Sequence, residues 1–412
     1  MTHHGVTDTV LPSPFRMRAP ASPPGPDFLK EDMRTRRQFL SAAATGAAAF
    51  AAAPLLACAA GEGTVMPTKG KHATRSVPTN APGNKFRPTT RIGLGGVAIG
   101  NGFASTSDAQ AQATLEAAWA AGVRYFDTSP WYGLGLSERR FGRFLHTRDA
   151  NEYVLSTKVG RILTAADAPP PKLLWSDASP FNYQYDYSAA GVRRSVEDSL
   201  QRLGVSRIDI VFIHDLSPDN QDMGDKWTEY FDQAIKGAIP ELTKMREEGL
   251  IKAWGFGVNR AEPALRALEV SDPDIFLLAT QYSLTNHEEA LSKTFPALEK
   301  RGISVVVGSP LDAGYLAGRN RYLYDGTIPP GVQEKRARMS AIAAKHGIDL
   351  RTAALQFAAA PSVVSSVIPG ARTPEQVKAN VQSMTVAIPD AFWEALKKEG
   401  LIARDAPIPS KA

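Results

Sequence analysis

Eight short apolar runs alternate with helical patterns from residue 89 onward, and this alternation limits the fold of the chain more than any other feature. Runs such as 208–213 and 303–307 are almost wholly apolar, which is typical of parallel strands that helices cover on both faces. We therefore predict a single α/β domain over residues 89–402 in which the strands close into a (β/α)8 barrel, the TIM barrel. The predicted strands are 92–97, 123–128, 153–158, 208–213, 251–258, 275–281, 303–308 and 363–368.

Helix start and stop signals separate these strands, and helices are predicted over 108–121, 188–203 and 232–248. Ser188 can cap the second of these helices, and Gly204 follows its last residue. An open, doubly wound sheet is the alternative fold. It is weaker because no Gly-x-Gly-x-x-Gly turn follows an early strand with an acidic residue about 20 positions on. A dinucleotide would therefore not be held in the Rossmann manner.

Residues 33–61 have the anatomy of a secretory signal, with a basic start, an Ala-rich stretch and small residues at the end. The pair Arg36 and Arg37, followed by Gln38-Phe39-Leu40, resembles the twin-arginine motif of a pathway that exports folded proteins. We therefore expect export by that pathway. A spanning anchor is the weaker alternative, because the stretch is short for a span of about 20 strongly apolar residues.

Two outcomes stay open for the exported protein. Leu55-Leu56-Ala57-Cys58 resembles a bacterial lipobox, in which Cys58 would be lipidated and would hold the protein on the membrane. An Ala-x-Ala type cleavage nearby would instead release it into the periplasm. Residues 1–32 are Pro-rich and are expected to be a disordered, over-extended N-terminus, and residues 62–88 an extended linker.

The net charge of +5 belongs to the N-terminal region. Residues 1–91 hold 12 Lys and Arg against 5 Asp and Glu, so the rest of the chain is close to neutral. A basic balance indicates a nucleic-acid partner only where the charges gather on a folded surface, and we expect no such partner. Cys58 is the only cysteine and the 7 histidines are scattered, so we expect no metal site.

Three of the predicted strands end on ionisable side chains. Asp127 follows VRYF, Lys158 follows YVLST and His214 follows IDIVFI, while Tyr132 stands a few residues beyond Asp127. Because the active site of such a barrel lies at the carboxyl ends of its strands, the four side chains should meet on one face. Each has a structural alternative as a helix cap, an ion pair or a packing residue, but together they indicate catalysis.

This set of side chains suits the proton transfer that accompanies hydride transfer to or from a carbonyl carbon. A tyrosine hydroxyl titrates near pH ~10, too high for a base at neutral pH, and a nearby ammonium lowers that pKa. We therefore predict Tyr132 as proton donor and acceptor, with Lys158 lowering its pKa and Asp127 keeping Lys158 charged. His214 is predicted to hydrogen-bond the substrate oxygen.

These residues and their surroundings resemble the aldo/keto reductase family over essentially all of residues 89–400. The segment GVRYFDTSPWYGLGLSERRFGRFL is similar to the stretch that carries the family's Asp, Tyr and Gly-x-x-Glu pattern, while STK supplies its Lys and DIVFIHD its His. The resemblance implies a TIM barrel that binds NAD(P) in an extended pose, with Asp127, Tyr132, Lys158 and His214 as the catalytic tetrad.

The same resemblance implies which residues hold the cofactor. Gly308 replaces an aromatic residue that stacks on the nicotinamide in many members. NADP-dependent members commonly have a lysine where Gly370 stands and an arginine where Gln376 stands, and such cations would bind the 2′-phosphate. NAD is therefore favoured, and NADP stays open because Arg372 could partly compensate. The implied cofactor-binding residues are Asn259, Gln281, Ser309, Leu311, Gly370, Arg372, Gln376 and Asn380.

Residues 181–220 resemble the aldose 1-dehydrogenases within the family, with pyridoxal 4-dehydrogenase close to them. This implies a small sugar or related aldehyde as substrate, oxidised from hemiacetal to lactone, with Trp131 and Trp175 as walls of its site. Two alternatives stay open, a nicotinamide-binding regulatory barrel and a sugar-binding barrel, both without turnover.

Overall fold

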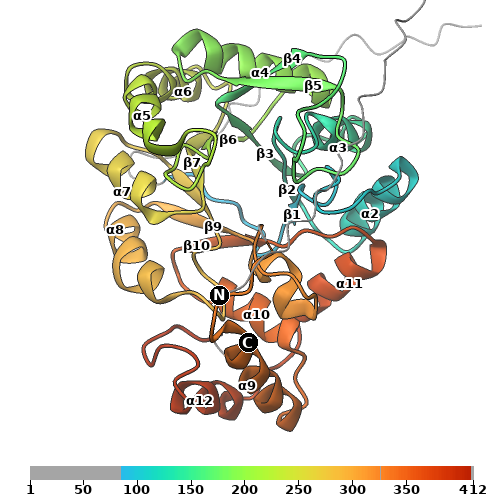
Figure 1. Ribbon diagram of the computed structural model, residues 1–412, viewed down its shortest axis with the longest axis vertical. Coiled ribbons are helices and arrows are strands. Elements are labelled where there is room, and N and C mark those ends of the chain that lie inside the picture. The colour runs from blue at the N-terminus through green and yellow to red at the C-terminus, as the bar shows by residue number, and fades with distance from the viewer. Residues whose placement is uncertain (1–84, 325, 410–412) are drawn as a thin grey trace, which may run out of the picture. The chain divides into compact units, whose positions relative to one another are not determined.

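The computed structural model describes residues 85–324 and 326–409, and within them eight parallel strands form one sheet in the order β1-β2-β3-β6-β7-β8-β9-β10 (Figure 1). Single parallel bridges, Ile92 to Val367 and Gly95 to Gly370, bring the last strand back to the first, so the sheet forms a nearly closed barrel. The predicted α/β barrel is confirmed. Its strands are β1 (Leu94–Gly95), β2 (Tyr125–Asp127), β3 (Val154–Val159), β6 (Ile210–His214), β7 (Ala253–Val258), β8 (Ile275–Ala279), β9 (Ser304–Gly308) and β10 (Val364–Ile368).

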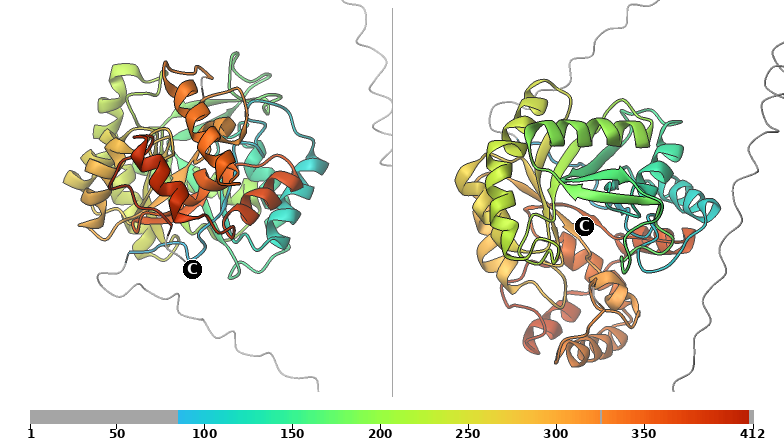
Figure 2. Two further views of the ribbon diagram at one scale, coloured as in Figure 1. Left: turned by 90° about the horizontal axis from the view of Figure 1, so that it is seen from below. Right: turned by 45° about the horizontal axis from the view of Figure 1, so that its top comes forward.

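Helices surround the sheet on its outer side (Figures 1 and 2). Ser107 and Ser188 cap the first and third of them, each accepting a hydrogen bond from a backbone N–H of the first turn. The described residues form α2 (Asp108–Ala120), α3 (Leu136–Leu145), α4 (Ala189–Leu203), α5 (Trp227–Lys236), α6 (Ala238–Glu247), α7 (Ala261–Val270), α8 (Phe295–Glu299), α9 (Val332–Lys345), α10 (Leu350–Ala359), α11 (Pro374–Ser383) and α12 (Asp390–Lys398). Shorter turns of 3-10 helix (Gly224–Lys226 and Asp312–Ala317) and π-helix (Ala290–Thr294) lie between them.

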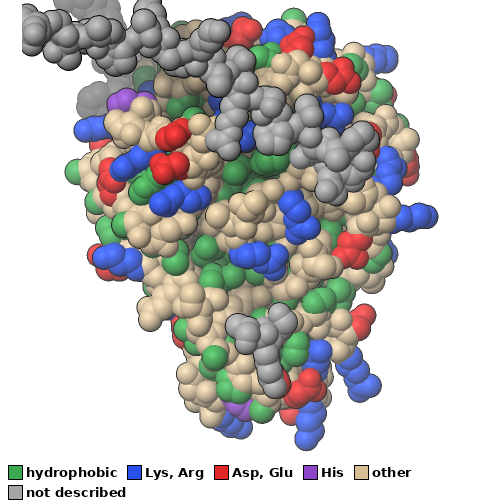
Figure 3. Space-filling model, turned by 180° about the vertical axis from the view of Figure 1, so that it is seen from behind, with side chains coloured by type: hydrophobic (Ala, Val, Ile, Leu, Met, Phe, Trp, Pro, Cys, Tyr) green, Lys and Arg blue, Asp and Glu red, His purple; other side chains and the backbone are tan. Residues whose placement is uncertain are grey.

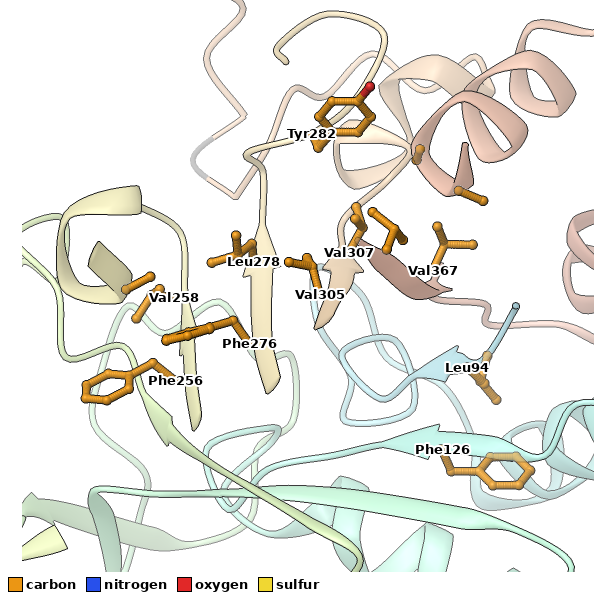
Figure 4. Close-up of a cluster of buried hydrophobic side chains, with 14 of the residues drawn as sticks. Leu94, Phe126, Phe256, Val258, Phe276, Leu278, Tyr282, Val305, Val307 and Val367 are labelled. Carbon is orange, nitrogen blue, oxygen red and sulfur yellow. The ribbon is translucent and has the colours of Figure 1, made fainter. Parts of the chain in front are cut away.

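Successive side chains on a strand point to opposite sides of the sheet, and here both sides are apolar. Phe126 and Phe276 lie in the large core between strands and helices (Figure 4). Tyr125 and Ile210, the first residues of β2 and β6, instead belong to a smaller cluster within the barrel, against which Phe86 packs. The amino end of the barrel is therefore filled with apolar side chains, which leaves the carboxyl ends of the strands for ligands.

The prediction of one helix over 232–248 is wrong, because the chain forms α5 and α6, which meet at Gly237. The backbone of Gly237 has φ −125° and ψ −76°, outside the helical region. A Cβ at this position would lie 2.6 Å from the carbonyl oxygen of Tyr187. Only glycine allows this close approach, and at the break the backbone N–H of Ala238 donates to the same carbonyl oxygen at 2.9 Å.

An antiparallel hairpin that was not predicted follows β3. It pairs β4 (Arg161–Ala165) with β5 (Phe181–Tyr185), and Arg161 lies opposite Tyr185. Because Gly160 alone separates β3 from β4, the hairpin continues from the carboxyl end of the barrel (Figure 2). The hairpin therefore stands where a substrate site is expected.

The predicted N-terminus 1–32 and signal segment 33–61 lie outside the described residues, as does most of the predicted linker 62–88. In the part of the chain that the structure describes, no helix combines the length and the apolar character that a membrane span requires. Lys and Arg side chains are interspersed with Asp and Glu over the face in Figure 3.

Candidate active site

A cavity of about 860 Å³ lies at the carboxyl ends of the strands. Its lining contains every predicted catalytic, cofactor-binding and substrate-binding residue except Gln281. Gln281 supports the wall instead, because its side-chain amide donates a hydrogen bond of 2.5 Å to the carbonyl oxygen of Asn259. Ligand sites usually measure about 300–1,000 Å³, so the cavity is large enough for more than a small substrate.

Lys158 and Asp127 form a buried ion pair at the base of this cavity, with Nζ 2.8 Å from Oδ2 and 2.7 Å from the carbonyl oxygen of Thr128. Ser156 lies opposite Asp127 in the sheet and two residues before Lys158, so all three side chains share one side. Its hydroxyl donates to the other carboxylate oxygen at 2.7 Å. Burial raises the pKa of the Asp127 carboxyl and lowers that of the Lys158 ammonium, and each charge opposes the shift of the other.

The ring of Tyr132 lies beside this pair, and Nζ of Lys158 is 4.5 Å from the ring centre. Burial raises the pKa of the Tyr132 hydroxyl well above its ordinary value, and the Asp127 carboxylate raises it further. Any lowering of this pKa by the Lys158 ammonium is therefore outweighed by burial and by the Asp127 carboxylate. The phenol is protonated at neutral pH and has a proton to donate.

His214 lies edge-on to Tyr132, with the ring centres 5.8 Å apart. Its Nδ1 is 3.1 Å from the hydroxyl oxygen of Ser129 and 3.5 Å from a terminal nitrogen of Arg161. Because a guanidinium only donates, Nδ1 is assigned as the unprotonated nitrogen and Nε2 as the one that carries the proton. Burial, followed by the charges of Lys158 and Arg161, lowers the pKa of this imidazole well below its ordinary value. The ring is neutral and offers one N–H.

Aromatic side chains wall the cavity next to Tyr132. Trp175 packs with its ring centre 5.5 Å from that of Tyr132 and 5.7 Å from that of Trp131. Tyr183 of the hairpin packs edge-on against Trp131, with ring centres 4.8 Å apart. The two tryptophans predicted to contact a substrate therefore do lie together beside the predicted acid.

Arg372 is largely engaged by the loop that follows β1. Its Nε donates to the Thr106 hydroxyl at 2.9 Å and its terminal nitrogen to the carbonyl oxygen of Gly102 at 2.6 Å. Its backbone N–H donates to the side-chain oxygen of Gln376 at 2.8 Å. Two residues that were predicted to meet the adenosine end of a cofactor are thus tied to each other and to the first loop of the barrel.

Arginines that were not predicted also line the cavity. Arg319 and Arg321 follow the 3-10 turn after β9, and both contribute to the lining together with Arg372. Burial lowers the pKa of Arg321, and the charges of Arg372 and Arg319 lower it further. Among the described residues, no carboxylate forms an ion pair with any of the three. One end of the cavity is therefore strongly cationic.

Carboxylates of the segment that follows β6 also line the cavity. These are Asp215, Asp219 and Asp222, which all stand in the loop after β6. Asp219 accepts a hydrogen bond of 3.1 Å from the side-chain amide of Asn259, and Asp222 accepts one of 2.6 Å from Tyr183. Within residues 85–324 and 326–409, no group of three or more His, Cys, Asp and Glu side chains is placed to bind a metal ion.

Comparison with known proteins agrees with this geometry. The model of the aldo/keto reductase family matches residues 91–399. D-threo-aldose 1-dehydrogenase of a Pseudomonas species is 36% identical over 321 residues, which cover 76% of this chain and 94% of that protein. Pyridoxal 4-dehydrogenase of Microbacterium luteolum is also 36% identical, over 76% of this chain and 95% of that protein.

Solved structures have the same architecture. The glycerol dehydrogenase of Gluconobacter oxydans superimposes with a TM-score of 0.59 at 25% identity, over 80% of this chain and 98% of its own. The holo form of an aldo-keto reductase from Bacillus halodurans superimposes with a TM-score of 0.58 at 24% identity and supports the fold. The chain belongs to the aldo/keto reductase family and is an oxidoreductase that works with a nicotinamide cofactor.

Proposed function

We propose that this protein is an NAD-dependent dehydrogenase that oxidises the hemiacetal carbon of an aldose to a lactone. The observation that carries the proposal is the meeting of Tyr132, His214 and the buried pair of Lys158 and Asp127 in one cavity. The two relatives at 36% identity are named as dehydrogenases, one of an aldose and one of pyridoxal, and they support this proposal.

The side chains in the cavity suggest a route for the proton transfer. A nicotinamide, when bound, supplies the hydride acceptor or donor. In the oxidising direction, Tyr132 as phenolate takes the proton of the substrate hydroxyl, and in the reducing direction the phenol returns it. His214 donates its Nε2 hydrogen to the same substrate oxygen and holds it beside Tyr132. Lys158 and Asp127 fix each other and the ring of Tyr132 without adding net charge.

The cavity fits an extended dinucleotide. Arg319 and Arg321 supply the positive charge that a diphosphate requires, and they line the same cavity as the predicted acid. NAD is favoured over NADP because the donors of Arg372 already serve Thr106 and Gly102, and because Gln376 is neutral. Few positive side chains near α11 would therefore be available to bind a 2′-phosphate.

We also propose that the protein is exported by the twin-arginine pathway. The proposal rests on Arg36 and Arg37 and on the Ala-rich segment that follows them. The exported enzyme would reach the periplasm, or would stay on the membrane through a lipid on Cys58. Since that pathway carries folded proteins, the barrel and a bound cofactor could cross the membrane together. Mass spectrometry of the mature N-terminus tests both the cleavage site and the lipid.

A turnover assay tests the enzymatic proposal. The full chain is given NAD or NADP with a panel of aldoses, pyridoxal and simple aldehydes, and the absorbance of the reduced cofactor is followed, with Tyr132→Phe as the matched control. We expect NAD-dependent oxidation of an aldose that the substitution lowers by at least about 100-fold. Carbonyl reduction with NADPH alone would reject both the cofactor and the direction. Binding of sugar or cofactor without any turnover would favour the regulatory or sugar-binding barrel.

A further inference from the structure

We propose that Arg161 is a positioning residue that keeps the proton of His214 on Nε2, so that the imidazole can donate a hydrogen bond to the substrate oxygen. Arg161 is the first residue of β4 and lines the cavity, so the hairpin supplies a charge to the catalytic centre. The inference rests on the proposed function, because it assumes that the substrate oxygen lies beside Nε2 of His214.

Among the described residues, two polar side chains lie within hydrogen-bonding distance of Nδ1 of His214. The hydroxyl oxygen of Ser129, at 3.1 Å, already accepts a hydrogen bond from the backbone N–H of Trp131. A hydroxyl can still either donate to Nδ1 or accept from it, so Ser129 is compatible with a proton on either ring nitrogen. A terminal nitrogen of Arg161, at 3.5 Å, only donates and is always charged, so it disfavours a proton on Nδ1.

The guanidinium of Arg161 is held beside the imidazole by several contacts. Its side chain is 5% exposed, and the same terminal nitrogen donates to Oδ2 of Asp215 at 2.8 Å. The guanidinium also lies 4.6 Å from the ring centre of Trp131 and 5.1 Å from that of Tyr185, which stands opposite Arg161 in the hairpin. Because the cation is paired and packed against two rings, its charge stays next to His214.

Asp215 supports the same form of the ring from its other side. Oδ1 of Asp215 lies 3.5 Å from Nε2 of His214, and an ionised carboxylate only accepts hydrogen bonds. The ion pair of Arg161 and Asp215 therefore places a donor at one ring nitrogen and an acceptor at the other. Since the contact to Nε2 is long, a substrate oxygen can take this hydrogen in place of Asp215.

The surroundings of His214 also favour an uncharged ring. The titratable and charged groups packed around it are Tyr132, Lys158, Arg161, Tyr187 and Asp215. Burial lowers the pKa of the imidazole, and the charges of Lys158 and Arg161 lower it further. Tyr187 donates to the backbone carbonyl oxygen of His214 and leaves the ring nitrogens free. Without Arg161, the ring loses one of two cations that oppose its protonation and the one donor-only group at Nδ1.

Arg161→Met and Arg161→Lys separate this role from packing, because both remove the planar group beside Trp131 and only the second keeps a charged donor. The full chain is labelled with nitrogen-15 in its histidines, and the ring signals of His214 are identified by their loss in His214→Asn. We expect the wild type and Arg161→Lys to carry the proton on Nε2 between pH 5 and 8. Arg161→Met should carry part of it on Nδ1 or titrate within this range.

The rate of oxidation of L-galactose by NAD should follow the state of the ring. Arg161→Met should lower kcat/KM by about 10-fold or more, the effect of one hydrogen bond, and Arg161→Lys should recover most of the loss. Asp215→Asn is the matched control, because it removes the same ion pair and leaves the guanidinium in the protein. It should leave the proton on Nε2.

A wild type that carries the proton on Nδ1 would overturn the proposal by itself, so the test does not depend on the variants folding. Unchanged ring signals in Arg161→Met, or equal losses of rate in Arg161→Met and Arg161→Lys, would also overturn it, because the guanidinium would then only pack. A change of the ring in Asp215→Asn alone would overturn it in favour of Asp215. Absence of turnover in the wild type would instead count against the proposed function, while the ring signals still show which nitrogen carries the proton.

Discussion

Removing Lys158 should destabilise the protein through Asp127, in a way that depends on pH. Nζ of Lys158 lies 2.8 Å from the carboxylate, and the exposed fractions of the two side chains are 1% and 2%. Breaking a buried ion pair by removing one partner typically costs about 3–5 kcal/mol, because the other charge is left without a partner. For Lys158→Met the Ser156 hydroxyl still bonds Asp127, so we expect a loss at the lower end, about 3 kcal/mol at pH 8.

Neutralising the partner should recover part of this loss. In the double variant Lys158→Met with Asp127→Asn no buried charge remains, so we expect it to be more stable than Lys158→Met alone by about 1–3 kcal/mol. Urea unfolding, followed by circular dichroism, gives the free energy of unfolding of the four proteins in this double-mutant cycle. A coupling energy within about 0.5 kcal/mol of zero would show that water reaches the pair and would refute the reasoning.

The pH dependence follows from the direction of the pKa shift. Burial raises the pKa of the Asp127 carboxyl above its unfolded value, and loss of the ammonium removes the main effect that opposes the rise. The contribution of such a group to stability is present at low pH and is lost as pH increases through the folded pKa. The deficit of Lys158→Met relative to the wild type should therefore be smaller at pH 5 than at pH 8. A deficit that is constant over this range would contradict the assignment of the buried charge to Asp127.

Three further outcomes are expected. Because burial raises the pKa of Tyr132, kcat for oxidation should increase with pH through the alkaline range, while reduction stays flat; a flat oxidation profile would exclude Tyr132 as the base. Arg319→Ala and Arg321→Ala should each raise the KM for NAD by about 10-fold, measured by initial rates, with kcat little changed; an unchanged KM would place the diphosphate elsewhere. Gly255→Ala should prevent folding, because its Cβ would lie 1.7 Å from a strand carbonyl oxygen, whereas Gly370→Ala, with 3.7 Å of clearance, should remain folded by circular dichroism.

The strands of the barrel were predictable because both of their faces are buried. Ile210 to His214 and Ser304 to Gly308 carry apolar side chains on the barrel side and on the helix side, so the pattern is visible without any knowledge of neighbours. The hairpin was not predictable in this way. In β5 the residues from Phe181 to Tyr185 alternate between half-buried and exposed, and the strand pairs only with β4 rather than with the barrel.

The break at Gly237 depends on a contact that is remote in sequence. Glycine within a helical pattern is compatible with a continuous helix, at a cost of about 1 kcal/mol relative to alanine. The close approach of the Tyr187 carbonyl oxygen, which leaves no room for a Cβ at Gly237, is set by tertiary packing. In the same way, the pKa of Tyr132 depends on its burial and on the nearby Asp127 carboxylate, and no spacing in the sequence reports how far the ring is buried.

Three of the four predicted catalytic side chains, Asp127, Lys158 and His214, were predictable because each stands at or next to the end of an apolar strand. The residues around them lie on turns that have no apolar periodicity. Asp215, Thr280 and Ser309 each follow a barrel strand directly, β6, β8 and β9, and each has a left-handed backbone with φ +47°, +62° and +53°. Such a conformation is uncommon and costly for a residue other than glycine, so it persists only where the surrounding structure fixes it. The packed core and the filled amino end of the barrel provide that support, and the strained turns all lie at the end that holds the cavity. One of these turns aims Asp215 at His214 and Arg161, so these contacts of the cavity wall depend on a backbone conformation that no apolar period in the sequence reports.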